Sequence, residues 1–271
     1  APGVDMATEG WSASSKTLGG GARTRGSIAA ARTYGFEWPL RDWDKVRRIF
    51  DYADGVYDTD PGVNYLYFVT PDAMRYNVMS QRWAQPVSAA FDAMPLLRGK
   101  KPDAASTPIN SLGYPAQSAV YTVTASDTPE PMYLPINPGS VLHIGAHGSS
   151  TGATGVRVTP YNGLVAGTPV TLTLLAVTDA TRVNASFSSN DFTGIEVQII
   201  AGNGTLTLSG VIAQLLPIGQ GPSTGDWIGG LGHEGCTFDG KPRRNVYNVD
   251  MGRGVVNTVV TATLKETKPW R

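Results

Sequence analysis

Residues 118–216 carry a run of short segments in which apolar and polar side chains alternate, and this run limits the fold most. Ile195, Val197 and Ile199 alternate with Glu196 and Gln198, the period of a strand with one buried face. The other segments are AVYTVTA, PMYLPI, SVLHIGA, GVRVTPY, VTLTLLAV and TLTLSGVIAQLLP. Turn residues separate them, as in Asn137-Pro138-Gly139 and Gly202-Asn203-Gly204. Closely spaced strands with such turns predict a β-sandwich or jelly roll.

The composition also favours a mostly β protein. Gly (32) and Pro (19) are frequent and charged residues make up only 16% of the 271 residues, which suits strands and turns better than helices. The length is sufficient for two domains. Because the formal net charge is zero, we expect no sequence-specific binding of nucleic acid. No stretch approaches the apolar length of a bilayer span, so we expect no membrane insertion.

Residues 40–54 form the best helix candidate. Its apolar residues step by three and four positions and therefore share one face: Trp43, Val46, Phe50 and Ala53. We expect Asp42 to cap the start, Gly55 to end the helix, and Asp44 to pair with Arg48 one turn later. This is the one helix of appreciable length that the sequence predicts.

The stretch 56–86 reads as a turn, a strand and a short helical or looped piece. The strand contains Tyr65 and Tyr67 among β-branched and aromatic neighbours. Thr70-Pro71-Asp72 is typical of a helix start, with Thr as cap and Pro in the first turn. The stretch ends around Trp83 and contains no nucleophile and base pair, so we interpret it as packing and surface structure.

The distribution of tryptophan predicts how the domains are organised. Trp11, Trp38, Trp43 and Trp83 precede the strand-rich middle, Trp227 and Trp270 follow it, and none lies within 118–216. We therefore divide the chain into an N-terminal domain (1–100), a Pro/Ser-rich linker (101–117), a sandwich (118–216) and C-terminal strands (217–271). Because the flanks resemble each other, our hypothesis is that the C-terminal strands return to the N-terminal domain and the sandwich is an insertion.

We considered catalytic and metal sites and predict none. His233, Glu234 and Cys236 are close in sequence, but no second ligand pair has matching spacing, so we expect a tight glycine turn that buries Cys236 and satisfies His233. His143 and His147 lack the glutamate and helical context of a zinc-hydrolase motif. Nucleophile-elbow, P-loop and dinucleotide motifs are missing. We expect no enzyme activity, no cofactor and no metal.

Sugar binding is the weaker expectation for the sandwich. Carbohydrate-binding surfaces usually present exposed aromatic side chains, above all Trp, and the sandwich has none. The aromatic residues it offers are Tyr121, Tyr133, Tyr161, Phe187 and Phe192, and several of them must fill the core. A non-catalytic glycan-binding sandwich nevertheless remains the alternative function.

Two segments resemble a known family. The first runs from Tyr65-Leu66-Tyr67-Phe68-Val69-Thr70-Pro71-Asp72 to Trp83-Ala84-Gln85-Pro86. The second is Gly230-Leu231-Gly232-His233-Glu234-Gly235-Cys236 with the terminal strand that ends before Trp270. Together with the sandwich between them, they resemble the minor tail proteins of long-tailed phages of actinobacteria, and more narrowly the distal tail protein family.

The resemblance implies a structural protein of the virion, located at the tail tip and made in the host cytoplasm. Its N-terminal domain would form a ring, usually a hexamer, that joins the tail tube to the baseplate. The sandwich, galectin-like or carbohydrate-module-like, would project outward and hold receptor-binding proteins, with a host-surface glycan as a further candidate partner. The lack of Trp in the sandwich favours docking of proteins over sugar binding.

Aromatic residues outside the sandwich are our candidates for inter-subunit or packing anchors, because aromatic side chains are enriched at the centres of interfaces. They are Trp11, Trp38, Trp43, Phe50, Tyr65, Tyr67, Trp83, Trp227 and Trp270.

Overall fold

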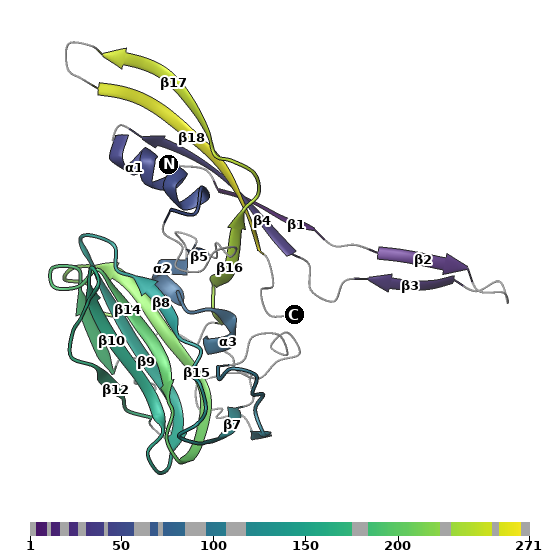
Figure 1. The fold of residues 1–271 in the computed structure, drawn as a ribbon, viewed down its shortest axis with the longest axis vertical. Helices are drawn as coiled ribbons and strands as arrows, with labels where there is room; N and C mark the ends of the chain where they lie inside the picture. The colour runs from purple at the N-terminus through teal and green to yellow at the C-terminus, as the bar shows by residue number, and fades with distance from the viewer. Residues whose placement is uncertain are drawn as a thin grey trace. The chain divides into compact units, whose positions relative to one another are not determined.

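The structure is a computed structural model (Figure 1), and the residues it describes are 4–9, 12–16, 22–26, 31–40, 43–56, 66–69, 73–84, 96–106, 118–174, 184–222, 229–250 and 255–266. This part of the chain is mostly β, as predicted, and it contains three short helices. None of the helices in it has the length and apolar character that crossing a bilayer requires.

The chain forms two units. Unit 1 comprises Ala1–Leu66 with Glu234–Pro269, and unit 2 comprises Tyr67–His233 with Trp270–Arg271. These boundaries differ from the predicted division, in which residues 67–100 belonged to the N-terminal domain and residues 217–233 to the C-terminal strands. The physical reason is that the segment 73–84 packs on a strand of the sandwich, so it belongs to unit 2.

The main sheet of unit 1 contains strands from both ends of the chain. Its antiparallel centre is the pairing of β18 (Val255–Glu266) with β4 (Ala31–Leu40), which places Ala262 opposite Phe36. Within unit 1 the sheet order is β1-β4-β18-β16, and β17 also pairs with β18. The bounds are β1 Val4–Glu9, β5 Leu66–Val69, β16 Gly232–Phe238 and β17 Arg243–Asp250. A separate hairpin joins β2 (Ser12–Lys16) to β3 (Ala22–Gly26).

Alternating side chains give this sheet one buried and one polar face. Tyr34 and Phe36 of β4 are buried, whereas the alternating residues Thr33 and Gly35 are half-exposed and Glu37 is exposed. The central strand repeats the pattern, with buried residues at Val260, Ala262 and Leu264. This period of two is expected of an antiparallel sheet that packs on one side only.

Helix α1 (Trp43–Ala53) forms where the spacing of apolar residues predicts it. It starts later than the predicted residue 40 because strand β4 continues to Leu40. Val46 is buried and Phe50 is half-buried, and Gly55 takes a positive φ of 75° just after the last turn, as a helix stop does. Arg47 pairs with Asp51 at 3.7 Å; the predicted Asp42 cap and the Asp44 and Arg48 side chains lie outside the described residues.

Unit 2 contains two antiparallel five-stranded sheets (Figure 1). The first has the order β13-β9-β15-β7-β6, and the second has the order β11-β10-β14-β8 with β12 also on β10. The bounds are β6 Ala104–Ser106, β7 Ser118–Val123, β8 Met132–Pro135, β9 Ser140–Ser150, β10 Gly155–Asn162, β11 Val165–Ala166, β12 Val170–Leu172, β13 Ala185–Ser188, β14 Gly194–Ile200 and β15 Gly204–Pro217.

One hydrophobic core joins the two sheets into a sandwich. Inward residues of β14 and β10, such as Val197 and Val158, belong to the same buried cluster as Leu142 of β9 and Leu208 of β15. The predicted alternation at Ile195, Val197 and Ile199 is confirmed, since all three are buried. The predicted linker is wrong in part, because residues 104–106 form β6 and pair with β7.

Two one-turn helices, α2 (Ala73–Tyr76) and α3 (Gln81–Ala84), contact strand β15. Between them lies Asn77, which is fully buried. Its Oδ1 accepts hydrogen bonds from the backbone N–H groups of Met79 (3.1 Å) and Ala213 (3.0 Å), and its Nδ2 donates to the carbonyl of Val211 at 3.4 Å. The Asn77 side chain therefore ties this segment to β15.

The glycine-rich segment 229–232 packs against the backbone of residues 77–80. Leu231 donates its N–H to the carbonyl of Asn77 and Gly232 donates to that of Met79, both at 3.0 Å. A Cβ on Gly232 would stand 2.4 Å from the carbonyl oxygen of Val78 and would also overlap the hydroxyl of Tyr67. Only glycine permits so close an approach of the two backbones.

We expect Asn77→Ala to destabilise unit 2 by about 2–4 kcal/mol, because it leaves two buried N–H groups without an acceptor. Urea unfolding followed by circular dichroism measures the loss. Asn190→Ala is the control, since that side chain is exposed, and we expect it to change the unfolding free energy by less than about 0.5 kcal/mol. Equal unfolding midpoints for the two variants would contradict a stabilising role of the Asn77 hydrogen bonds.

Candidate functional site

The structure assigns different positions to the aromatic anchors. Trp83 is fully buried in α3, within the core of unit 2. Phe50 is half-buried on α1, and Tyr67 is half-buried on β5, with its hydroxyl donating to the carbonyl of Val78. For Trp38 of β4 and Trp43 of α1 the structure describes the backbone but not the side chain. Four anchors lie outside the described residues: Trp11, Tyr65, Trp227 and Trp270.

Trp83 therefore has a packing role within its own unit. The guanidinium carbon of Arg82 lies 5.9 Å from the centroid of the indole ring, within the range of a cation–π interaction, and Arg82 is itself buried. An indole with no exposed surface cannot lie at the centre of an interface in the folded unit.

The histidines and the cysteine occupy strands. The predicted tight turn around His233 and Cys236 is wrong, because Gly232–Phe238 forms β16. Cys236 is buried as expected, and the ring of His233 stacks on Phe68 at 6.3 Å. His143 bonds to Ser186 Oγ at 2.8 Å and to the carbonyl of Gln220 at 3.2 Å. In the described part of the chain, no three His, Cys, Asp or Glu side chains come together as a metal site would require.

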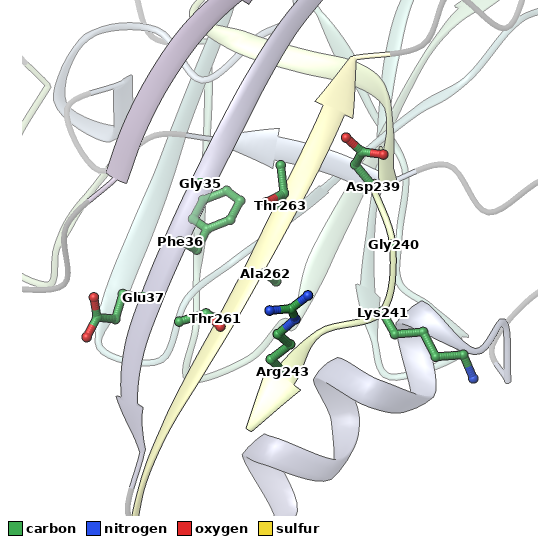
Figure 2. A pocket seen from close by; sticks show the side chains of 10 residues that line it. All are labelled: Gly35, Phe36, Glu37, Asp239, Gly240, Lys241, Arg243, Thr261, Ala262 and Thr263. Carbon is green, nitrogen blue, oxygen red and sulfur yellow. The ribbon is translucent and has the colours of Figure 1, made fainter. Parts of the chain in front are cut away.

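A pocket of about 520 Å³ lies in unit 1 beside the segment that connects β16 to β17 (Figure 2). Asp239 keeps this segment against the sheet by donating its N–H to the carbonyl of Thr263 at 2.8 Å, and pairing with β18 resumes where Arg243 faces Thr261. The lining residues come from β4, β18 and this segment: Gly35, Phe36, Glu37, Asp239, Gly240, Lys241, Arg243, Thr261, Ala262 and Thr263.

The pocket carries charges of both signs. Figure 2 shows the guanidinium group of Arg243 between β18 and the 239–241 segment, whereas Glu37 and Lys241 point away from it. Lys241 Nζ lies 3.1 Å from Asp54 Oδ1 in an exposed ion pair, which contributes little to stability. The lining holds threonine hydroxyls and charged groups but no histidine or cysteine, so its chemistry suits recognition of a polar partner group.

A second cluster of polar side chains lies on the sheet β11-β10-β14-β8 of unit 2. Tyr133 of β8 is directly opposite Glu196 of β14, and it is 58% exposed. Tyr161 of β10 reaches the same carboxylate, with its hydroxyl donating to Glu196 Oε2 at 3.3 Å. The other candidate aromatic residues of the sandwich, Tyr121 and Phe187, are buried in the core.

The carboxylate of Glu196 affects both phenols. Desolvation, together with a hydrogen bond to Glu196 and its negative charge, raises the pKa of Tyr133 from 10.0 to about 12. Desolvation first, and then the charge of Glu196, raises the pKa of Tyr161 in the same direction. Both phenols therefore keep their protons over the whole neutral range and act as hydrogen-bond donors to the carboxylate.

Sequence reasoning missed this cluster as a unit. The alternation of Glu196 and Gln198 placed them on the outward face of β14, but nothing in the sequence aligned Tyr133 with Glu196. The signal that could have contributed is the same alternation in β10, where Arg157, Thr159 and Tyr161 share the outward face.

Comparison with known proteins adds no assignment, since the chain matches no family model, no curated protein and no solved structure.

We expect Trp83→Ala to destabilise unit 2 by about 3–5 kcal/mol, because it opens a cavity in a closed core. Urea unfolding measures the loss, and Trp83→Phe, which keeps an aromatic ring, should lose clearly less. If Trp83→Ala left the unfolding transition unchanged but abolished self-association, the packing role would be wrong.

We expect Glu196→Gln to lower the pH at which Tyr133 and Tyr161 ionise, because it removes the charge that opposes phenolate formation. Ultraviolet difference spectroscopy against pH measures the shift, and Asp191→Asn, at an exposed turn, is the control. An unchanged titration in Glu196→Gln would contradict the coupling between the carboxylate and the phenols.

In the unaltered protein, the raised pKa of Tyr133 contributes to the free energy of unfolding. This contribution is fully present below pH 10.0, and it is lost as the pH rises through about 12.

Proposed function

We propose that the chain is a structural virion protein of a phage tail tip, which forms a ring that joins the tail tube to the baseplate and receptor-binding apparatus. The observation that carries the proposal is the composition of unit 1. Both ends of the chain contribute strands to its sheet, and unit 2 is inserted between them. Such an arrangement lets one unit assemble with copies of itself while the other is carried as an appended module.

The strand edges of unit 1 supply the means of assembly. Among the described strands, β1 pairs only with β4, and β17 pairs only with β18. The outer side of each strand therefore offers backbone N–H and C=O groups that can pair with another chain. Contact between two different edges of neighbouring copies is head-to-tail, and such contacts close into a ring when the rotation between copies allows it.

The side chains of β17 agree with a contact surface. Val246 is 49% exposed on this edge strand, next to the exposed Asn245 and, further back, Arg243 at the pocket. A break in register between Val246 and Asn248 bends the strand, which limits uncontrolled edge pairing. An exposed apolar side chain on an edge strand is a candidate contact for a neighbouring copy.

The proposed partners follow from the position in the tail. The protein itself would form the ring, a hexamer by resemblance, with the tail tube protein on one side and the hub or receptor-binding proteins on the other. The role is mechanical and needs no catalytic residue or cofactor.

We expect the purified protein to form closed rings, and Val246→Lys to abolish them, because a charge at the edge strand would be buried without a partner. Mass photometry counts the copies and negative-stain images show the central hole. Leu164→Lys is the matched control, since Leu164 is 98% exposed on a turn of unit 2, and its rings should remain. A monomer at every concentration tested, or intact rings from Val246→Lys, would overturn the proposed assembly through β17.

A further inference from the structure

The pocket of unit 1 exists because the segment between β16 and β17 is longer than the stretch of β18 beside it. Asp239 donates its N–H to the carbonyl of Thr263, and Arg243 lies opposite Thr261. The segment therefore takes four residue steps where β18 takes two, so it must bow away from β18. The resulting pocket of about 520 Å³ is within the range of small-molecule sites, roughly 300–1,000 Å³.

Strand β4 leaves further space beside this segment. Gly35 is directly opposite Thr263, and Glu37 is directly opposite Thr261. Directly opposed residues of an antiparallel pair have their side chains on the same face of the sheet. Because Gly35 has no side chain, β4 places nothing next to the hydroxyl of Thr263. The pocket therefore has a polar wall and an unfilled place beside it.

Two charged groups of opposite sign remain available in the pocket, the guanidinium of Arg243 and the carboxylate of Asp239. Lys241 already pairs with Asp54, with 3.1 Å between Nζ and Oδ1, and Glu37 points away from the pocket (Figure 2). Among the residues that the structure describes, no hydrogen bond or ion pair engages the side chain of Arg243 or that of Asp239. The two groups also form no ion pair with each other.

Strand geometry sets the separation of these two groups. Asp239 is aligned with Thr263 and Arg243 with Thr261, two residues further back on β18. A strand rises about 3.4 Å per residue, so the two positions are about 7 Å apart. The ammonium and carboxylate groups of an α-amino acid are joined through one carbon atom, and a charge-assisted hydrogen bond of about 2.8 Å at each end extends their reach to this range.

We propose that the pocket of unit 1 binds a free α-amino acid in its zwitterionic form. Arg243 donates to the carboxylate of the ligand, and its planar guanidinium can make two parallel hydrogen bonds. Asp239 accepts from the ammonium group. The hydroxyls of Thr261 and Thr263 lie between these two contacts, and the space beside Gly35 takes the side chain of the amino acid.

The charges of the pocket disfavour other classes of ligand. A ligand with charge of one sign is attracted by one of the two groups and repelled by the other. A polyanion such as a nucleotide would meet one guanidinium group and the carboxylates of Glu37 and Asp239. A metal ion has too few ligands, since no three His, Cys, Asp or Glu side chains come together in the described part of the chain.

This inference goes beyond the ring and does not depend on it. Assembly was argued from the strand edges of unit 1, whereas the pocket lies between the segment 239–242 and β18. A protein that forms rings without binding an amino acid would overturn the inference alone. A protein that binds one but stays a monomer would overturn the proposed assembly alone.

The test is saturation-transfer NMR on the full chain with each of the common α-amino acids, followed by isothermal titration of the best binder. We expect at least one of them to bind. Arg243→Gln and Asp239→Asn should each weaken binding about tenfold or more, because each removes one of the two charge-assisted contacts. Arg75→Gln and Asp191→Asn remove the same charges at exposed positions of unit 2, and these controls should bind as the unaltered protein does.

Two analogues of the best binder test the contact at each end. The N-acetylated amino acid lacks the ammonium group and the primary amide lacks the carboxylate, so each should bind about tenfold more weakly or worse.

Three results would overturn the proposal. The first is that the folded protein, verified by circular dichroism, binds none of the amino acids. The second is that Arg243→Gln and Asp239→Asn, both folded, bind with the affinity of the unaltered protein. The third is that the N-acetylated form binds as tightly as the amino acid itself, which would show a site for carboxylates without recognition of the ammonium group.

Discussion

The hydrogen bonds around Asn77 are the constraint on which the arrangement of the chain depends. The Asn77 side chain fixes the segment 77–79 to β15, and the backbone groups of Asn77 and Met79 accept the N–H groups of Leu231 and Gly232. The segment near the start of unit 2 and the segment near its end are thus hydrogen-bonded to each other around Asn77. An inserted domain whose ends lie close together can be carried without distorting the sheet that it interrupts.

Pairing between β4 and β18 has the opposite character, because it joins residues that are far apart in the sequence. Thr33 faces Lys265, and Leu40 faces Thr258. Closing a loop that contains all of unit 2 costs entropy before any contact compensates for it, and such non-local pairings form slowly. The sheet of unit 1 cannot be completed until the C-terminal strand is made, whereas the strands of the sandwich are nearly contiguous.

Sequence reasoning succeeded where a local pattern decides the structure. Period-two alternation predicted the burial of Ile195 and Ile199, and the spacing of three and four predicted α1. It failed where a distant partner decides. Residues 73–84 look like part of the N-terminal domain until they are seen to pack on β15, and residues 104–106 become a strand only because β7 is beside them. The cluster of Tyr133, Tyr161 and Glu196 was missed for the same reason, since the sequence of one strand does not determine which residues of another strand lie opposite it.

The two segments that carry the family resemblance are the ones that meet around Asn77. Residues 67–84 and 230–232 are distant in sequence, yet Gly232 lies against Val78 and Tyr67, and Gly230 lies against the backbone of Met79 and Ser80. Any side chain at either glycine would collide with backbone atoms, so these positions are restricted by sterics, not by a reaction. These contacts therefore concern the packing of the two ends of unit 2 against each other.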